Sequence, residues 1–234
     1  SKYYLPTFDL NQLGNRLFRS EDLHLGVSIR SFRSEKVSSA ISSLLEDEKE
    51  KAANAIKEIN HSYPIKITRS ISKAKDWLRE NARGSERYGL LVSSGARRLK
   101  PLGLFAGIVS EKDSPNWFLN NQDDIRSSYA LEDPATEFQV QGLELDWAGI
   151  IWDGDLIKTE SDWLYKSFKG TKWMNINKSI DKKYKLNAYR VLLTRARQGM
   201  VIVIPKGDEN DPTRQSEIYD PTWEYLKEIG LDVI

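Results

Sequence analysis

The chain has 234 residues, 39% of them apolar and 29% charged, so we expect a globular protein with one large α/β domain, or one domain with a small appendage. It contains no cysteine and two histidines, which excludes disulfides and Cys-ligated zinc and leaves little basis for serine–histidine catalysis. With a formal net charge of +1, binding to nucleic acid requires a local basic patch, and no apolar run reaches the roughly 20 residues that cross a membrane.

Residues 1–22 form an irregular segment that contains Pro6 and Gly14. The segment has neither an initiating methionine nor the apolar region of a signal peptide, so we expect the chain to be a piece of a longer protein. We interpret residues 1–22 as a lead-in from an upstream domain and residues 23–234 as the domain itself.

Predicted strands and helices alternate along the first half of the domain. Apolar runs predict strands over 23–30, 63–68 and 88–93, and hydrophobic spacing predicts helices beginning near Ser34, near Ala52 and at Ser70 or Ser72. Connections between parallel strands are nearly always right-handed. The alternation of strands and helices, with right-handed connections between them, therefore predicts a doubly wound, mostly parallel sheet with helices on both faces.

The second half contains two predicted insertions. The alternation of predicted strands and helices stops over 101–134, which we interpret as an insertion or long connection at one edge of the sheet. Aromatic residues over 153–184 predict an inserted β-hairpin. Between them, 147–152 is a further apolar strand. A helix from about Lys185 to Arg197 follows the hairpin, and a terminal helix carries Pro221 in its first turn.

Arg195 lies in the predicted helix that runs directly into an apolar strand. It shares a helix face with Val191 and Leu192, so we expect it to be held against the body of the domain. The polar residues on a second face are Arg190, Thr194 and Arg197. A positioned arginine stabilises the charge on the γ-phosphoryl oxygens of a nucleoside triphosphate, with roughly 10³- to 10⁵-fold effects on rate. The alternative is that Arg195 only pairs with a buried carboxylate.

Two further segments contain residue types that bind nucleotides. In Gln141-Gly-Leu-Glu144 a glycine allows a backbone N–H to approach a phosphate, and a glutamate can accept a hydrogen bond from a ribose hydroxyl. Equally, Gly142 can end a short helix and Glu144 can be a surface charge. Arg30 ends the first predicted strand, where ligands bind in doubly wound sheets.

Together these segments resemble the second, C-terminal RecA-like domain of a superfamily 1 helicase-like ATPase, of the UvrD, RecD and Rep type. The match at 193–197 to the family's A-L-T-R-A-R motif is close, the match at 136–144 to T-x-H-K-x-Q-G-x-E is partial, and that at 25–33 is loose. The run 141–152 extends the similarity to uncharacterised bacterial helicase-like ATPases allied to the Schlafen helicase domains.

The resemblance implies a P-loop-NTPase-type fold and an ATP site shared between two domains. Arg30 and Arg195 would reach the γ-phosphate, and Gln141, Gly142 and Glu144 would form the coupling motif on the nucleotide side. No G-x-x-x-x-G-K-[ST] loop occurs in the chain, so ATP and Mg²⁺ would be bound mainly by an upstream Walker-loop domain. The resemblance also implies that the protein acts on DNA or RNA in the cytoplasm. We expect the isolated chain to be inactive as an ATPase.

The best basic patch follows the strand at 88–93. Hydroxyls and cations at a strand end can hold backbone phosphates. The candidate nucleic-acid-binding residues are Ser93, Ser94, Arg97, Arg98 and, through the resemblance, Thr136. Phe138 and Gln139 stand where the family has a His-Lys pair, so this chain lacks a cation that could contact nucleic acid.

The sequence is also compatible with two other functions. The replaced His-Lys pair favours a nucleic-acid-binding or partner-docking module that keeps the helicase shape without ATP coupling. Asp153 and Asp155 follow an apolar strand, as do the carboxylates of Mg²⁺-dependent phosphohydrolases. Asp-Gly-Asp is also favourable turn chemistry, so the two aspartates can equally be turn residues.

Overall fold

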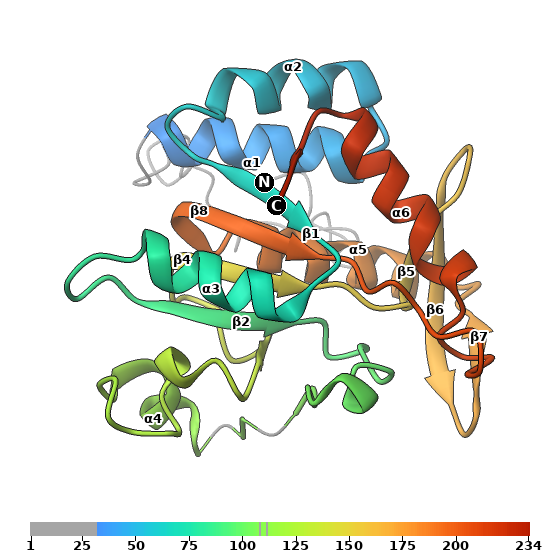
Figure 1. Cartoon of the computed structure of the whole chain (residues 1–234). Coiled ribbons are helices and arrows are strands. Elements are labelled where there is room, and N and C mark those ends of the chain that lie inside the picture. Colours follow the sequence, from blue (N-terminus) through green and yellow to red (C-terminus); the bar gives the residue numbers. More distant parts are fainter. Residues whose placement is uncertain (1–31, 108, 111) are drawn as a thin grey trace, which may run out of the picture. The chain divides into compact units, whose positions relative to one another are not determined.

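The computed structural model describes residues 32–107, 109–110 and 112–234, and residues 32–234 form one compact unit. Arg30, the predicted strand at 23–30 and the lead-in at 1–22 lie outside the described residues. The elements are α1 (Phe32–Leu45), α2 (Lys49–Ile59), β1 (Ile65–Thr68), α3 (Ile71–Asn81), β2 (Tyr88–Val92), α4 (Ser114–Leu119), β3 (Ala135–Thr136), β4 (Leu145–Ile151), β5 (Leu156–Lys158), β6 (Trp163–Lys169), β7 (Lys172–Asn175), α5 (Ser179–Leu193), β8 (Ala196–Val203), α6 (Ser216–Glu228) and β9 (Asp232–Val233) (Figure 1).

The main sheet has six parallel strands in the order β3-β2-β4-β8-β1-β9. Every residue of β2 and β4 is buried, which explains why these strands are largely apolar in sequence, with Asp146 as the one charged residue. In the centre, Gly149 and Ile150 of β4 pair with Val201 and Ile202 of β8. The mostly parallel sheet predicted from the sequence is confirmed.

Helices cover both faces of this sheet, as predicted. Ala148 and Ile150 of β4 belong to a core formed with α1, α2, α5 and α6, whereas Trp147 and Ile151 belong to a second core formed with α3. This alternation follows from the two-residue period of a strand. Figure 1 shows α3 and α5 on opposite sides of the sheet, so the fold is doubly wound and consistent with a RecA-like domain.

The helix that leads to Arg195 differs from the prediction at both ends. It covers Ser179–Leu193 and ends before Arg195, because β8 begins at Ala196 and pairs with β4. Arg197 is therefore a strand residue and does not share a helix face with Arg190 and Thr194. The terminal helix also begins earlier, at Ser216, so that Pro221 lies inside it instead of in its first turn.

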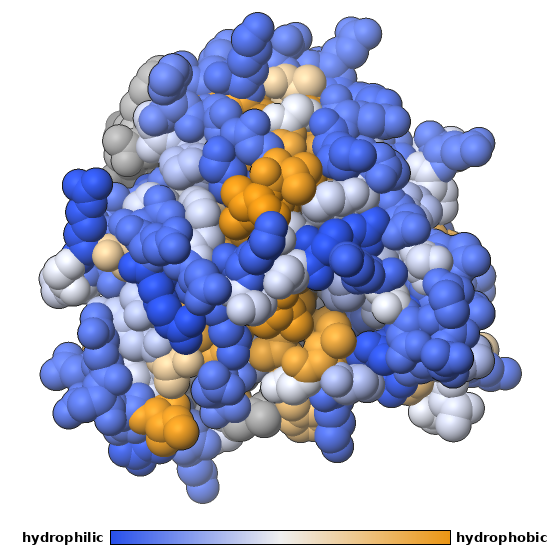
Figure 2. Space-filling model, viewed as in Figure 1, coloured by the Kyte–Doolittle hydropathy of each residue, from blue (hydrophilic) through white to orange (hydrophobic). Residues whose placement is uncertain are grey.

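The two regions that we interpreted as insertions lie outside the parallel sheet. The region 153–184 forms a three-stranded antiparallel sheet, β5-β6-β7, and the start of α5, which is more than the expected hairpin. The region 101–134 holds α4 and short 3₁₀ turns. Figure 2 shows a largely hydrophilic face with apolar side chains in a strip through its middle. Among the described helices, none is long and apolar enough to cross a membrane.

Candidate functional site

The loop before β4 and the end of α5 meet at the amino edge of the parallel sheet. Leu145 and Ala196 are paired at the first positions of β4 and β8, and the Leu145 N–H donates to the carbonyl of Arg195 at 3.0 Å. The residues just before each strand must therefore lie side by side. This register brings together two segments about 50 residues apart that only the family resemblance had linked.

Arg195 is held in place by backbone carbonyls on both segments. Its side chain is 8% exposed, and Nε donates to the Val191 carbonyl at 3.1 Å. Nη1 lies 3.4 Å from the Val140 carbonyl and 3.3 Å from the Leu143 carbonyl. These contacts fix the guanidinium between the end of α5 and the loop, so the expectation that Arg195 is held against the domain is confirmed.

The loop itself is open on its outer side. Gln141, Gly142 and Glu144 are exposed. Apart from its two chain neighbours, no atom of the described residues lies within 4 Å of the place that a Gly142 side chain would take. The φ of Gly142 is +79°, a left-handed conformation that favours glycine. Burial, and then the negative charge of Glu144, raises the pKa of Tyr63, whose hydroxyl donates to the Ala196 carbonyl at 3.1 Å.

Arg197 and Asp146 form a second, more exposed pair next to this loop. Nη2 of Arg197 lies 2.7 Å from Oδ1 of Asp146, and the Arg197 side chain is 57% exposed. Oδ2 of Asp146 accepts from the Arg87 N–H at 2.7 Å. Asp146 was not among the residues predicted for the site, because a carboxylate inside an apolar strand carries no signal about its partners.

The other candidate residues lie at the opposite, carboxyl edge of the sheet. In the main sheet, the strand that follows β2 along the chain is β3, on one side of the β2–β4 pair, and the next strand of this sheet after β4 is β8, on the other side. The crevice between β2 and β4 is therefore a topological switch point, where open α/β sheets commonly bind ligands. Here protein side chains fill it. Ser93 Oγ donates to Asp155 at 2.5 Å, and Ser94 donates its N–H and hydroxyl to Glu137 at 2.8 and 2.6 Å.

Asp155 is the centre of a buried ion pair at this edge. Its side chain is fully buried and accepts hydrogen bonds from Lys185 Nζ at 2.7 Å and from the Tyr189 hydroxyl at 2.6 Å. Burial and the charge of Asp155 raise the pKa of Tyr189 well above its usual value. A Cβ on Gly95 would collide with Lys185 Nζ and lie 2.7 Å from Asp155, so glycine is needed for this close approach.

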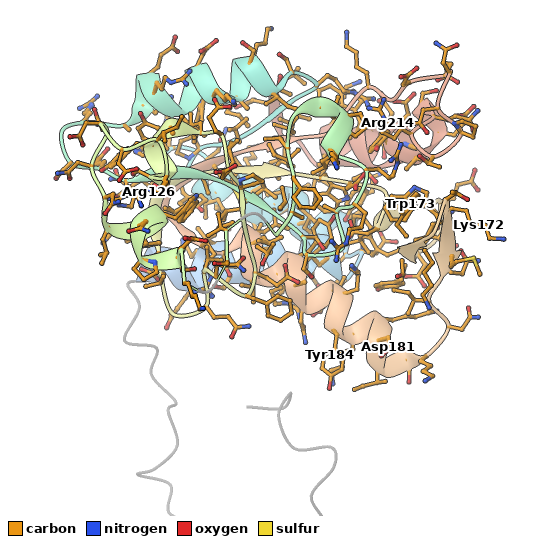
Figure 3. All side chains as sticks on the ribbon, turned by 90° about the horizontal axis from the view of Figure 1, so that it is seen from below. Arg126, Lys172, Trp173, Asp181, Tyr184 and Arg214 are labelled. Atoms are coloured by element: carbon orange, nitrogen blue, oxygen red, sulfur yellow. The ribbon has the colours of Figure 1, made fainter. Side chains whose placement is uncertain are left out.

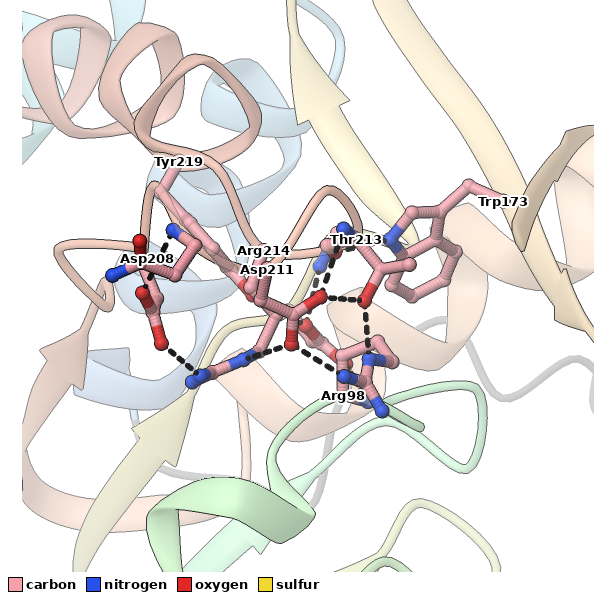
Figure 4. A network of polar contacts seen from close by, with 10 residues as sticks. Arg98, Trp173, Asp208, Asp211, Thr213, Arg214 and Tyr219 are labelled. Atoms are coloured by element: carbon pink, nitrogen blue, oxygen red, sulfur yellow. Dashed lines mark hydrogen bonds and ion pairs between the residues drawn. The ribbon is translucent and has the colours of Figure 1, made fainter. Parts of the chain in front are cut away.

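Asp153 and Arg98 belong to a neighbouring network that joins β4 to the 208–214 loop and α6 (Figure 4). Asp153 accepts from the Arg98 N–H at 2.8 Å and from the Tyr219 hydroxyl at 3.0 Å. The Arg98 guanidinium binds Asp211 and Thr213, both at 2.6 Å. Arg98 is thus engaged inside the protein.

The predicted nucleic-acid-binding residues are brought near one another but differ in accessibility. Arg97 is exposed, whereas Ser93, Ser94 and Arg98 make the internal contacts above. Thr136 is 3% exposed, and its hydroxyl donates to Oε1 of Gln139. Phe138, where the family has part of its His-Lys pair, is 65% exposed. Only one of the five candidates, Arg97, therefore presents an exposed side chain.

The two aspartates after β4 do not form a metal site. Their oxygens are occupied by N–H and O–H donors, from Ser93, Lys185 and Tyr189 on Asp155 and from Arg98, Gly154 and Tyr219 on Asp153. In the part of the chain that the structure describes, no group of three or more His, Cys, Asp or Glu residues could hold a metal ion.

Asp153 is expected to make stability depend on pH. Burial, and then the charge of Asp155, raises the pKa of Asp153 to about 7 from its ordinary value of 3.8. The folded state therefore holds more protons than the unfolded state between about pH 4 and pH 7, so stability falls as the pH rises through this window. Between pH 5 and pH 8 the loss from this group is on the order of 2 kcal/mol.

Urea unfolding of the wild type and of Asp153→Asn at these two pH values measures the effect. The variant, which carries no titrating carboxyl at this position, should lose less stability than the wild type as the pH rises. Equal losses in the two proteins would show that Asp153 does not titrate in this range.

The parallel sheet with helices on both faces is an α/β fold consistent with a RecA-like domain. A model of the Schlafen group 3 DNA/RNA helicase domain matches residues 10–206, and the chain belongs to this family. No curated protein matches the chain. At the level of the family, the function is therefore helicase-like and related to nucleic acid.

Proposed function

We propose that the chain is the C-terminal RecA-like half of a superfamily 1 helicase-like ATPase. In this proposal, ATP and Mg²⁺ are bound mainly by an upstream Walker-loop domain. The present chain closes the site with Arg195, with Arg30 and with the loop at 141–144. Hydrolysis of ATP drives an action on DNA or RNA.

The observation that carries this proposal is the contact between Arg195 and the carbonyls of Val140 and Leu143. It places a fixed cation directly beside an exposed glycine loop. A preorganised charge of this kind stabilises the negative charge that develops during phosphoryl transfer, because it needs no rearrangement when the reaction occurs. A fixed cation and an open glycine loop at the same edge of the sheet support the proposal.

The described residues fit part of a bound nucleotide. The open side of Gly142 permits a phosphate to approach the backbone, and Glu144 is an exposed acceptor for a ribose hydroxyl. ATP supplies the phosphoryl group that is transferred to water. No described acidic cluster fits Mg²⁺, so in this proposal the metal ligands come from the Walker-loop domain.

ATP hydrolysis by two proteins tests the proposal: the isolated chain and the parent protein, meaning this chain joined to its Walker-loop domain. The isolated chain should not hydrolyse ATP, because it has no loop to cradle the phosphates. The parent protein should hydrolyse ATP, and single-stranded nucleic acid should raise its turnover. Hydrolysis by the isolated chain at the rate of the parent would contradict a shared site.

A second candidate function is a nucleic-acid-binding module without ATP coupling. The observation that favours it is the low exposure of Arg195, 8%, together with Phe138 and Gln139, which stand where the family has its His-Lys pair. This function predicts salt-sensitive binding of nucleic acid by the isolated chain. It also predicts that nucleic acid leaves ATP turnover of the parent protein unchanged, which is the opposite of the first proposal.

A further inference from the structure

Positive charge is concentrated in residues 163–185, which we call the lysine arm. The arm contains seven of the 35 Lys and Arg residues of the chain but only one of its 34 Asp and Glu residues, Asp181. Its formal net charge is therefore +6, and that of the rest of the chain is −5. The arm forms β6, β7 and the first turns of α5, and Lys182 of α5 lies over the ring of Tyr165 in β6.

The two faces of the β6–β7 hairpin have different surroundings. On one face, the ring of Phe168 contacts Arg98, and Nε1 of Trp173 donates to the Thr213 carbonyl at 2.8 Å. On the other face, Lys169 and Lys172 are paired across the strands, and both are exposed. Figure 3 shows Lys172 at the outer rim and Trp173 closer to the body of the protein. The end of this face that carries Lys169 and Lys172 is thus exposed to solvent, whereas Tyr165 on the same face packs against Lys182 of α5.

Lysine side chains at two places in the arm are unfavourable for the stability of the fold. Like charges directly opposite each other in an antiparallel pair are destabilising, as at Lys169 and Lys172. Lys178 is the N-cap of α5, where the helix dipole favours a negative charge. Within the described residues, none of these three lysines forms an ion pair. An anion bound beside either position would relieve the unfavourable interaction there.

Exposed apolar side chains accompany the lysines on α5. Tyr184 is 66% exposed and Ile180 is 45% exposed, and their spacing of four residues places them on one face of the helix. Figure 3 shows Tyr184 projecting outward from α5, on the same outer rim as Asp181. The arm thus contains both an exposed aromatic ring and exposed lysines, the two residue types that bind single-stranded nucleic acid, because bases stack on the ring while cations hold the backbone.

We propose that the lysine arm binds single-stranded nucleic acid, with Lys169 and Lys172 on backbone phosphates and Tyr184 stacked on a base. This surface lies on different elements from the loop at 93–98, where Ser93, Ser94 and Arg98 are engaged in internal contacts. The proposal takes its ligand class from the proposed function, but it requires neither ATP nor the upstream domain.

The test is a titration of the full chain with a fluorescent single-stranded oligonucleotide between 50 and 200 mM salt, without nucleotide. In Lys169→Gln/Lys172→Gln, the slope of log K against log salt should fall in magnitude by about 1.4, since each phosphate contact contributes about 0.7 for single strands. The affinity lost over this salt range then becomes about sevenfold smaller. The matched control, Lys57→Gln/Lys73→Gln, removes the same charge from α2 and α3 and should keep the wild-type slope.

A reversal of charge separates binding from folding. In K172E, the glutamate faces Lys169 across the hairpin, so the thermal unfolding midpoint should rise while binding weakens. A purely structural role of Lys172 would move both quantities in the same direction. Tyr184→Ala should bind about tenfold more weakly and Tyr184→Phe should bind like the wild type, because the ring alone provides the stacking.

Three results would overturn the proposal. The first is an equal salt slope in the arm variant and the control. The second is binding of the arm to anionic phospholipid vesicles with no binding to the oligonucleotide. The third is the absence of any binding of single-stranded nucleic acid by the wild-type chain. This result would not bear on the proposed ATP site, which is tested separately by ATP turnover of the parent protein.

Discussion

Replacement of Arg195 by alanine is expected to lower ATP turnover of the parent protein by about 10³- to 10⁵-fold, which is the usual effect of losing an arginine that contacts the transferred phosphoryl group. The side chain is already fixed by the carbonyls of Val191, Val140 and Leu143, so its charge is in place before the reaction. Arg195→Lys should also be strongly impaired, because an ammonium cannot reproduce the planar fork of a guanidinium.

Arg197→Ala is the matched control for this experiment. Arg197 is two residues away, but its side chain is 57% exposed and pairs with Asp146, so its removal should leave turnover close to that of the wild type. Thermal unfolding of each variant shows whether the loop at 140–143 still folds without its arginine contacts. Equal turnover in Arg195→Ala and Arg197→Ala, with both proteins folded, contradicts the assigned role.

Removal of the Asp155 carboxylate is expected to destabilise the chain by about 3–5 kcal/mol, the usual result of leaving one charge of a buried pair without its partner. Lys185 has a side chain that is only 12% exposed and points at this carboxylate, and the hydroxyls of Ser93 and Tyr189 lose their acceptor as well. Urea unfolding of Asp155→Ala near neutral pH measures the loss.

The double variant Asp155→Ala/Lys185→Met separates the unpaired charge from the other contacts. Removing both charges should restore a large part of the stability, since replacing a buried ion pair by apolar groups is often close to neutral. Glu224→Ala breaks the exposed pair with Lys227 and should change stability by less than about 1 kcal/mol. A loss of unfolding free energy of similar size in Asp155→Ala and Glu224→Ala would contradict this prediction, because it would mean that the Lys185 ammonium becomes hydrated when Asp155 is removed.

The parallel sheet could be predicted because its central strands are buried on both sides. Runs such as 88–93 and 147–152 are continuously apolar, and short runs of this kind are typical of strands with both faces covered. The burial of Arg195 could also be predicted, from its apolar neighbours Val191 and Leu192. In contrast, the start of α5 was missed, because residues 179–185 are rich in lysine and lack apolar periodicity.

The contacts of the candidate residues could not be predicted because they join distant parts of the chain. Ser93 and Asp155 are 62 residues apart, and Arg98 and Asp211 are 113 residues apart. Local patterns identify residue types at strand ends, but the register of neighbouring strands decides which side chains meet. Likewise, the end of α5 before Arg195 is set by the pairing of β8 with β4, which is a long-range interaction.

Hydrogen exchange of the parent protein with and without a non-hydrolysable ATP analogue tests the position of the shared site most directly. The amino edge should be protected, so peptides that cover 140–146 and 191–197 should exchange more slowly when the nucleotide is bound, while 93–98 and 153–155 at the carboxyl edge should not change. Unchanged exchange at the amino edge, or protection only at the carboxyl edge, would contradict the account.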